Sequence, residues 1–187
     1  MIAYIAFGCR LLLAVVFFAA AAGKLSRRRN LAEFRASVGV FGVKPRWRSA
    51  VAAAVIACEL TVAALLTVNA TALVGLGGGA ALLIVFTAAI SSVVQQRTSA
   101  SCRCFGISAQ PLGRRHLVRN AILLSITAVG VAATVLATAL EDTIRNPTAL
   151  MLSGFVAMVL AALVISYDDL VAMLLPPSKP VRGRASG

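Results

Sequence analysis

The run Leu11-Leu-Leu-Ala-Val-Val-Phe-Phe-Ala-Ala-Ala-Ala22 contains no polar side chain and lies within a longer, mainly apolar segment, residues 2–22. Four more segments approach the roughly 20 residues that a helix needs to cross a bilayer. They are residues 50–68, 72–94, 120–140 and 148–166. All are rich in Ala, Val and Leu, and none alternates with a period of two, which favours helices over a barrel. The sequence therefore predicts an all-α, polytopic transmembrane helix bundle of four to five spans.

The composition is that of an integral membrane protein. Hydrophobic residues make up 60% of the 187-residue chain and charged residues 13%, against about 25% charged residues in soluble domains. The spans leave no room for a separate catalytic domain. We expect residues 1–175 to form one transmembrane domain and residues 176–187 to be a disordered cytoplasmic tail. The basic cluster follows the first apolar segment instead of preceding it, so this segment reads as a retained helix and not as a signal peptide.

Lys and Arg residues mark the cytoplasmic side of a membrane protein. Sixteen of the 18 basic residues lie after the first segment, after the third segment or near the C-terminus. They are Lys24, Arg27, Arg28, Arg29, Arg35, Lys44, Arg46 and Arg48; Arg97, Arg103, Arg114, Arg115 and Arg119; and Lys179, Arg182 and Arg184. The opposite side has only Arg145, because Arg10 lies inside the first segment. We therefore expect a multi-pass protein of the inner or plasma membrane, with the N-terminus outside and the C-terminus in the cytoplasm.

Arg10 and Glu59 are charged residues inside predicted spans. A charge at this depth costs about 2.5–3.5 kcal/mol on insertion scales, so each should face the bundle and have a partner. At 1.5 Å per residue, Arg10 lies about 18 Å and Glu59 about 14 Å from the cytoplasmic end of its span. These similar depths predict an intramembrane ion pair. It would serve as a clamp between two helices or as part of a proton or quinone site.

Residues 30–43 predict a short interfacial helix between the first two spans. Leu31, Phe34, Val38 and Phe41 recur at helical spacing, and basic residues flank them. Such a segment lies among lipid headgroups and attracts anionic membrane lipid. It is either a surface anchor or a lid over the loop that carries the cysteines described next.

The stretch Cys102-Arg103-Cys104 lies in a polar interruption between the third and fourth apolar segments, which the charge count places in the cytoplasm. The thiolate is the reactive form of cysteine, and the Arg103 guanidinium favours it. A disulfide across a single residue is strained, and strained disulfides are easily reduced. These residues predict a reactive, reversible pair, with Cys102, Cys104 and Arg103 as the catalytic candidates. Cys58, about 12 Å into the membrane, is a candidate relay, although isolated cysteines in spans are usually inert packing residues.

Gly75, Gly77, Gly78 and Gly79 form a glycine-rich run near the start of the third segment. No Lys-Ser or Lys-Thr follows, so a phosphate-binding loop is rejected. We expect these glycines to let another helix approach closely.

Several short motifs occur in order between residues 5 and 140. They are Arg10-Leu-Leu-Leu-Ala-Val-Val-Phe-Phe-Ala-Ala-Ala-Ala-Gly-Lys24-Leu25, Phe34-Arg-Ala-Ser-Val-Gly-Val-Phe-Gly-Val-Lys-Pro45, Glu59, Cys102-Arg-Cys-Phe-Gly106 and Arg119-Asn120. Their order and spacing resemble the DoxX-like membrane proteins and, among them, the methylamine utilisation protein MauE family.

The resemblance implies a redox-associated role. Members of this family are linked to maturation of the disulfide-rich small subunit of methylamine dehydrogenase, together with a thioredoxin-like partner. DoxX relatives are linked to thiol oxidation and quinone reduction. By this resemblance, Cys102 and Cys104 are the exchanging pair and a quinone is a candidate cofactor. Arg103 stands where the family more usually has a small residue, so the redox tuning is expected to differ.

Other interpretations compete with this one. A metal site at Cys102, Cys104 and His116 lacks a fourth ligand, and neighbouring arginines repel a cation, so no metal is expected. A non-enzymatic scaffold or a transporter-like module, with the cysteines only stapling a loop, remains the alternative, and whether the chain is an enzyme is left open. Nucleic acid is not an expected partner, because topology accounts for the basic residues.

Overall fold

The computed structural model describes residues 1–95 and 114–174, with side chains for residues 1–92 and 116–167. The described elements are all helical. The α-helices are α1 (Ile2–Leu25), α2 (Arg28–Val38), α3 (Arg48–Thr67), α4 (Ala72–Gln95), α5 (Arg114–Ala139) and α6 (Pro147–Leu174). The short 3₁₀ turns are η1 (Gly39–Phe41), η2 (Pro45–Trp47) and η3 (Asn69–Thr71). The all-α prediction is confirmed.

Five of these helices, α1, α3, α4, α5 and α6, are long and apolar enough to cross a membrane. Helices α3 and α4 match the predicted segments to within two residues at either end. Helix α5 begins six residues earlier than predicted, and α6 ends eight residues later. This is the architecture of a multi-pass membrane protein.

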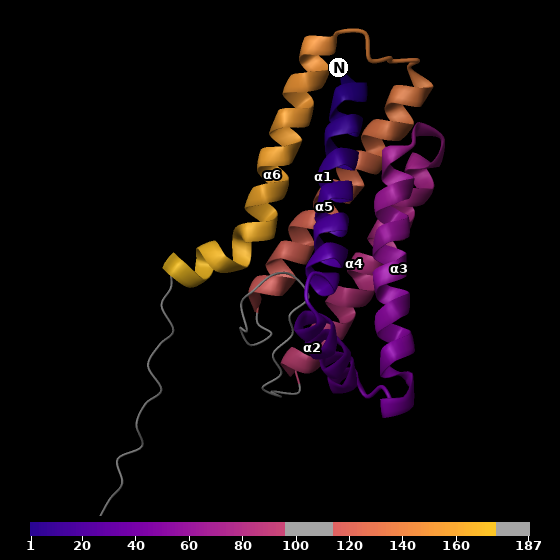
Figure 1. The fold of residues 1–187 in the computed structure, drawn as a ribbon. Helices are drawn as coiled ribbons and strands as arrows, with labels where there is room; N and C mark the ends of the chain where they lie inside the picture. The colour runs from indigo at the N-terminus through magenta and orange to yellow at the C-terminus, as the bar shows by residue number, and fades with distance from the viewer. Residues whose placement is uncertain (96–113, 175–187) are drawn as a thin grey trace, which may run out of the picture.

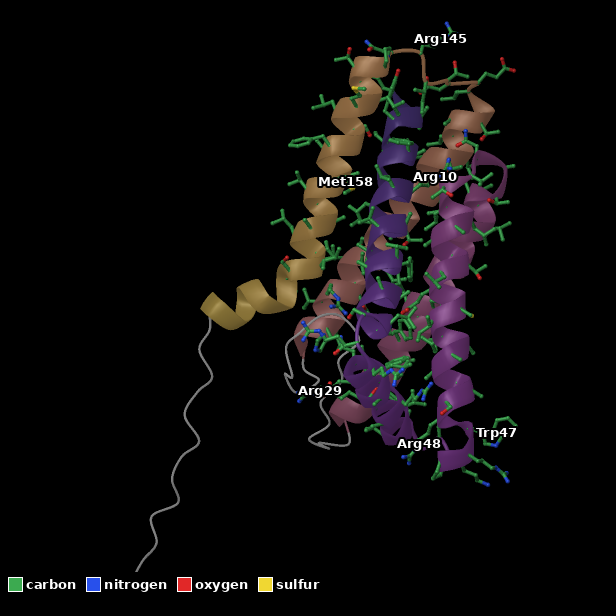
Figure 2. The ribbon with its side chains drawn as sticks, in the orientation of Figure 1. Arg10, Arg29, Trp47, Arg48, Arg145 and Met158 are labelled. Carbon is green, nitrogen blue, oxygen red and sulfur yellow. The ribbon has the colours of Figure 1, made fainter. Side chains whose placement is uncertain are left out.

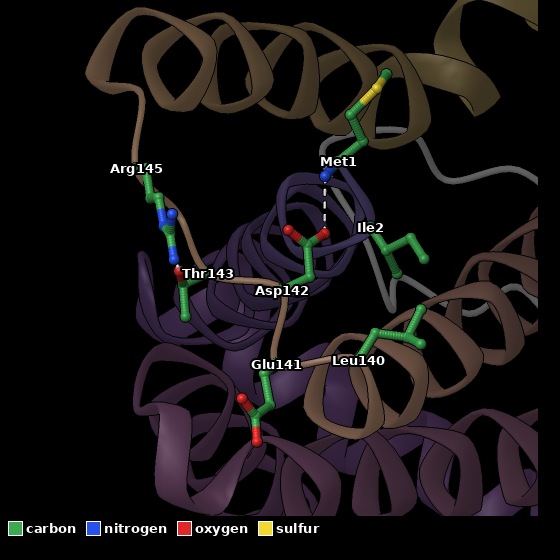
Figure 3. A pocket seen from close by; sticks show the side chains of 7 residues that line it. All are labelled: Met1, Ile2, Leu140, Glu141, Asp142, Thr143 and Arg145. Carbon is green, nitrogen blue, oxygen red and sulfur yellow. Dashed lines mark hydrogen bonds and ion pairs between the residues drawn. The ribbon is translucent and has the colours of Figure 1, made fainter.

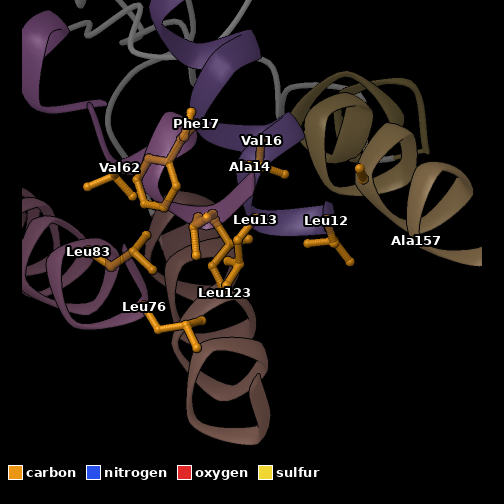
Figure 4. Close-up of a cluster of buried hydrophobic side chains, with 13 residues drawn as sticks. Leu12, Leu13, Ala14, Val16, Phe17, Val62, Leu76, Leu83, Leu123 and Ala157 are labelled. Atoms are coloured by element: carbon orange, nitrogen blue, oxygen red, sulfur yellow. The ribbon is translucent and has the colours of Figure 1, made fainter. Parts of the chain in front are cut away.

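Helix α1 is the centre of the bundle (Figure 1), where α3, α5 and α6 pack around it and α4 packs against α3 and α5. Leu13, Val16 and Phe17 of α1 are almost fully buried, and they meet Leu76 of α4 and Leu123 of α5 in the main apolar cluster (Figure 4). Helix α6 touches mainly α1. Half of the α1 span is buried but only 11% of the α6 span, so most of the α6 surface is available to lipid.

Helix α2 lies below the C-terminal end of α1, across the end of the bundle (Figure 1). Phe34 and Val38 are buried against Ala21, Ala52 and Ile56 of α1 and α3. The predicted interfacial helix is therefore present, although it begins at Arg28 and is already packed on the bundle. Its α-helical part ends at Val38, which leaves Phe41 in the following turn and partly exposed.

The glycine-rich run lets α4 approach α3, as expected. A Cβ added at Gly75 would lie 3.0 Å from the backbone nitrogen of Leu66, and one at Gly78 would lie 3.1 Å from Val62 Cγ2. Gly79 faces Phe17 of α1 in the same way, at 3.2 Å. Gly77 points into open space, so it makes no close approach.

Candidate functional site: a buried ion pair above helix α2

Lys24 of α1 and Glu59 of α3 form a two-point ion pair inside the bundle. The Lys24 Nζ donates to Glu59 Oε1 at 2.5 Å and to Oε2 at 2.7 Å. Lys24 is 2% exposed and Glu59 is fully buried. Charges this deep are stable in a low-dielectric interior only when they are paired with good geometry, and this geometry provides both hydrogen bonds.

The heights of the helices explain why these two residues meet. Helix α3 begins well below the point where α1 ends (Figure 1). Glu59 is the twelfth residue of α3, about 16 Å above its start, so it lies level with the end of α1. The Cα–Cβ bonds of a helix tilt towards its N-terminus. The Lys24 side chain, one residue before the end of α1, therefore extends back into the bundle.

Helix α2 closes this pair from below. The Phe34 ring centroid lies 5.1 Å from Lys24 Nζ, within the range of a cation–π interaction. The turn between α1 and α2 is fixed by Asn30, whose Nδ2 donates to the Gly23 carbonyl and to Ser26 Oγ, both at 3.0 Å. The aromatic face and the short turn together exclude solvent from the lysine.

The pair can hold one proton in either of two places. Transfer of the proton from Nζ to a carboxylate oxygen converts the ion pair into a neutral amine and carboxylic acid. In a dry interior the neutral form avoids the desolvation cost of two charges. The pair therefore keeps a net charge of zero in either form.

A second polar contact joins α4 and α5 within the same bundle. Asn120, 2% exposed, donates through Nδ2 to Thr87 Oγ1 at 3.3 Å, and its neighbour Arg119 is 3% exposed. The sequence presents Arg119 as a charge on the cytoplasmic side and Arg119-Asn120 as part of a family motif. Their burial beside a span was not predicted, although two adjacent polar residues opening an apolar run were a usable signal.

The predicted Arg10–Glu59 ion pair is wrong. Arg10 donates through Nε to the Leu66 carbonyl at 3.0 Å and through Nη1 to Asn69 Oδ1 at 2.7 Å, while Glu59 is bonded to Lys24. The depth estimate assumed that the first two spans end at one level, but α3 extends further down than α1 (Figure 1). Glu59 is consequently too low for Arg10.

Of the other predicted site residues, Cys58 alone lies in the described part of the chain, and it does not join the pair. Cys102, Arg103 and Cys104 lie outside the described residues. Cys58 is exposed on α3, although Glu59 beside it is buried. Cys9 is half-buried, with its Cβ 3.1 Å from the position of a Cβ added at Gly130 of α5. His116 is half-buried near the start of α5.

Comparison with known proteins assigns the family. Residues 2–136 match the family model described as methylamine utilisation protein MauE. The chain belongs to the MauE family. A relative in Paracoccus denitrificans, named methylamine utilization protein MauE, is 36% identical over 156 residues, which are 81% of this chain and 80% of the relative. The resemblance inferred from the short motifs is confirmed. No solved structure matches the chain.

The MauE match includes Lys24, Glu59 and the whole of α1 to α4. It ends at residue 136, within α5, so α6 lies beyond it. The buried ion pair and the helix that covers it therefore both belong to the region that this chain shares with the MauE family model.

Proposed function

We propose that this MauE-family protein is a membrane accessory protein of methylamine utilisation that performs thiol–disulfide exchange through Cys102 and Cys104. The family match and the name of the Paracoccus denitrificans relative support the pathway. The Cys-x-Cys spacing and the Arg103 between the two thiols support the chemistry.

The proposed exchange has two steps. A thiolate of a partner dithiol attacks the Cys102–Cys104 disulfide and forms a mixed disulfide, and the second partner thiolate displaces it. The partner leaves oxidised, while Cys102 and Cys104 take up two electrons and two protons. The reduced pair then passes these electrons and protons to a thioredoxin-like disulfide or to a quinone. The same steps in reverse would reduce a partner disulfide.

One observation on the bundle carries the proposal. Helix α4 ends at Gln95 and α5 begins at Arg114, both at the end of the bundle that α2 covers (Figure 1). Cys102 follows Gln95 by seven residues and Cys104 precedes Arg114 by ten. The described ends of this loop thus lie at the same end of the bundle, which supports a position for both thiols on the side of the membrane that α2 faces.

We assign the Lys24–Glu59 pair a positioning role in this proposal. It joins α1 to α3 beside Phe34 of α2, and so fixes the part of the frame that α2 covers. A relay through Cys58 is a weaker part of the proposal, because its side chain is exposed on α3 and not directed at the buried pair.

The charge distribution supports a cytoplasmic position for this end of the bundle. In the described part of the chain, ten basic residues lie in α2, in the turns beside it or at the starts of α3 and α5, and such a bias sets the orientation during insertion. Cys104 should react in intact cells with a membrane-permeant thiol reagent only. Labelling by an impermeant maleimide would reverse the proposed orientation.

Substitution of the cysteines tests the function. We expect Cys102→Ser and Cys104→Ser each to abolish growth on methylamine in cells whose growth on it depends on this protein, with membrane insertion retained. Cys9→Ser is the matched control and should support normal growth. If both loop variants support full growth, the redox proposal is wrong and the chain acts as a scaffold.

A further inference from the structure

A pocket with both polar and apolar lining lies at the end of the bundle opposite α2. The α3–α4 hairpin stops short of the α5–α6 connection (Figure 1), and a pocket of about 470 Å³ occupies the resulting step. Its lining comes from α1, the α3–α4 hairpin, the end of α5 and the α5–α6 connection, and it includes Arg10, Asn69, Thr134, Thr138 and Glu141. This volume lies within the range of small-molecule sites.

Arg10 supplies hydrogen-bond donors to this pocket. Its side chain lies at the level of the α3–α4 hairpin (Figure 2), and the residue is 8% exposed. It makes two hydrogen bonds, to Leu66 O and Asn69 Oδ1, and no carboxylate lies within ion-pair distance among the described residues. Three of the five guanidinium N–H groups therefore have no partner in the described part of the chain. A buried cation without a counter-ion is costly, so an anionic group fits here.

The wall formed by α5 offers acceptors. Thr134 Oγ1 donates its proton to the Gly130 carbonyl at 2.7 Å, and Thr138 Oγ1 donates to the Thr134 carbonyl at 2.9 Å. Both hydroxyl oxygens therefore have only lone pairs left for a ligand. The outer part of the pocket consequently suits a group that donates hydrogen bonds.

Glu141 stands at the mouth of the pocket in a left-handed conformation, with φ of +52°. It is the second residue after α5, where Asp142 N donates to Ala137 O at 2.9 Å and Glu141 N to Thr138 O at 3.3 Å. Glycine is the usual residue at this position of such a helix end. The neighbouring Asp142 is paired with the Met1 amino group, and Figure 3 shows the Glu141 carboxylate directed away from that pair. Glu141 therefore adds a separate negative charge.

We propose that this pocket binds a small zwitterion, with its carboxylate on Arg10 and Asn69 and its ammonium group on Glu141 and Thr138. Arg10 lies on α1 and Glu141 beyond the end of α5, on different parts of the lining, so a short carbon chain should separate the two charges of the ligand. Phe7 and Ala137 in the lining provide apolar surface for that chain. The site lies away from the Lys24–Glu59 pair and does not depend on the proposed thiol exchange.

Calorimetry on the purified full chain in detergent tests the proposal. The probe is 6-aminohexanoate, with hexanoate and hexylamine as matched compounds that each lack one charge. We expect saturable binding of 6-aminohexanoate, and at least about tenfold weaker binding of both controls, since a charged hydrogen bond contributes this much.

The variants separate the two ends of the site. Glu141→Gln should weaken 6-aminohexanoate binding about tenfold and leave hexanoate binding unchanged. Arg145→Gln, which removes a charge from the same loop but not from this pocket, should have no effect. Absence of saturation at about 10 mM, equal binding of hexanoate, or an unchanged affinity in Glu141→Gln would each overturn the proposal.

Discussion

Lys24 and Glu59 are joined by two short hydrogen bonds, at 2.5 and 2.7 Å, although 35 residues separate them in the chain. They link the central helix α1 to α3, next to Phe34 of α2. The net stabilisation from a buried ion pair is small, but removal of one partner leaves an uncompensated charge. A single substitution should therefore destabilise the protein more than its share of a double substitution.

Removal of one partner of the pair should destabilise the protein strongly. We expect Lys24→Met or Glu59→Gln to lower the free energy of unfolding by about 3–5 kcal/mol, because the remaining group is left buried without its partner. The double variant Lys24→Met/Glu59→Gln should cost less than the sum of the two. Reversible unfolding in mixed detergent micelles would measure all three.

The exposed ion pair between Arg29 and Glu33 on α2, at 2.9 Å, is the matched control. Arg29→Gln should cost only about 0.3–0.5 kcal/mol, the usual value for a solvated pair at this helical spacing. Strict additivity of the Lys24 and Glu59 substitutions would show that the two side chains are not energetically coupled.

The aromatic cover over Lys24 should contribute through its ring. Phe34→Leu keeps a large apolar side chain but removes the cation–π interaction, so we expect a loss of about 0.5–2 kcal/mol in unfolding free energy. Phe41→Leu, in the exposed turn after α2, should change little. Equal effects of the two substitutions would mean that the ring over Lys24 contributes only apolar area.

The close approach of α3 and α4 makes a sharp prediction for two neighbouring glycines. Gly75→Ala would place a Cβ 3.0 Å from a backbone atom of α3, which cannot move without shifting the helix, and should cost about 1–3 kcal/mol. Gly77→Ala meets nothing and should be neutral or stabilising by about 0.5–1 kcal/mol. Thermal unfolding of the two variants would compare them. The packing account fails if Gly75→Ala is the more stable one.

Asp142 should make stability depend on pH in the acid range. The Met1 amino group and the Ala3 N–H, at 2.7 and 3.1 Å, hold the pKa of this carboxyl below its ordinary value. A group with a lowered folded-state pKa stabilises the fold above its unfolded value, about 3.9, and loses that contribution as the pH falls through the folded pKa. Melting curves of the protein and of Asp142→Asn should differ near neutral pH and converge in acid. A constant difference at all pH values would contradict this role.

The spans could be read from the sequence because hydropathy acts locally. A run such as Leu11–Ala22 has to be buried in lipid or protein whatever its neighbours are, so helix type and number follow from it. The close contact at Gly75 could also be anticipated, because only a small residue permits it. The residues 96–113 around Cys102 and Cys104 lie outside the described structure, so the site proposed there stays a prediction from sequence.

The partner of Glu59 could not be predicted in the same way. Pairing depends on the relative heights of helices, which follow from tertiary packing, and α1 ends well above the start of α3. Lys24 was counted as a loop charge because it follows the apolar run, yet its side chain is directed back into the bundle. Arg10 is held instead by a carbonyl near the end of α3, which no side-chain pattern reveals.

The central claim, that Cys102 and Cys104 are a reversible redox pair, is tested most directly by the oxidation state of the four thiols in isolated membranes. Free thiols would be blocked with one alkylating reagent, disulfides reduced, and the released thiols labelled with a second reagent of different mass. We predict that Cys102 and Cys104 take the second label together and shift to the first after treatment with reductant, while Cys9 and Cys58 take the first label throughout. If Cys102 and Cys104 carry the first label in untreated membranes and stay reduced after mild oxidation, they form no pair and the redox account is wrong.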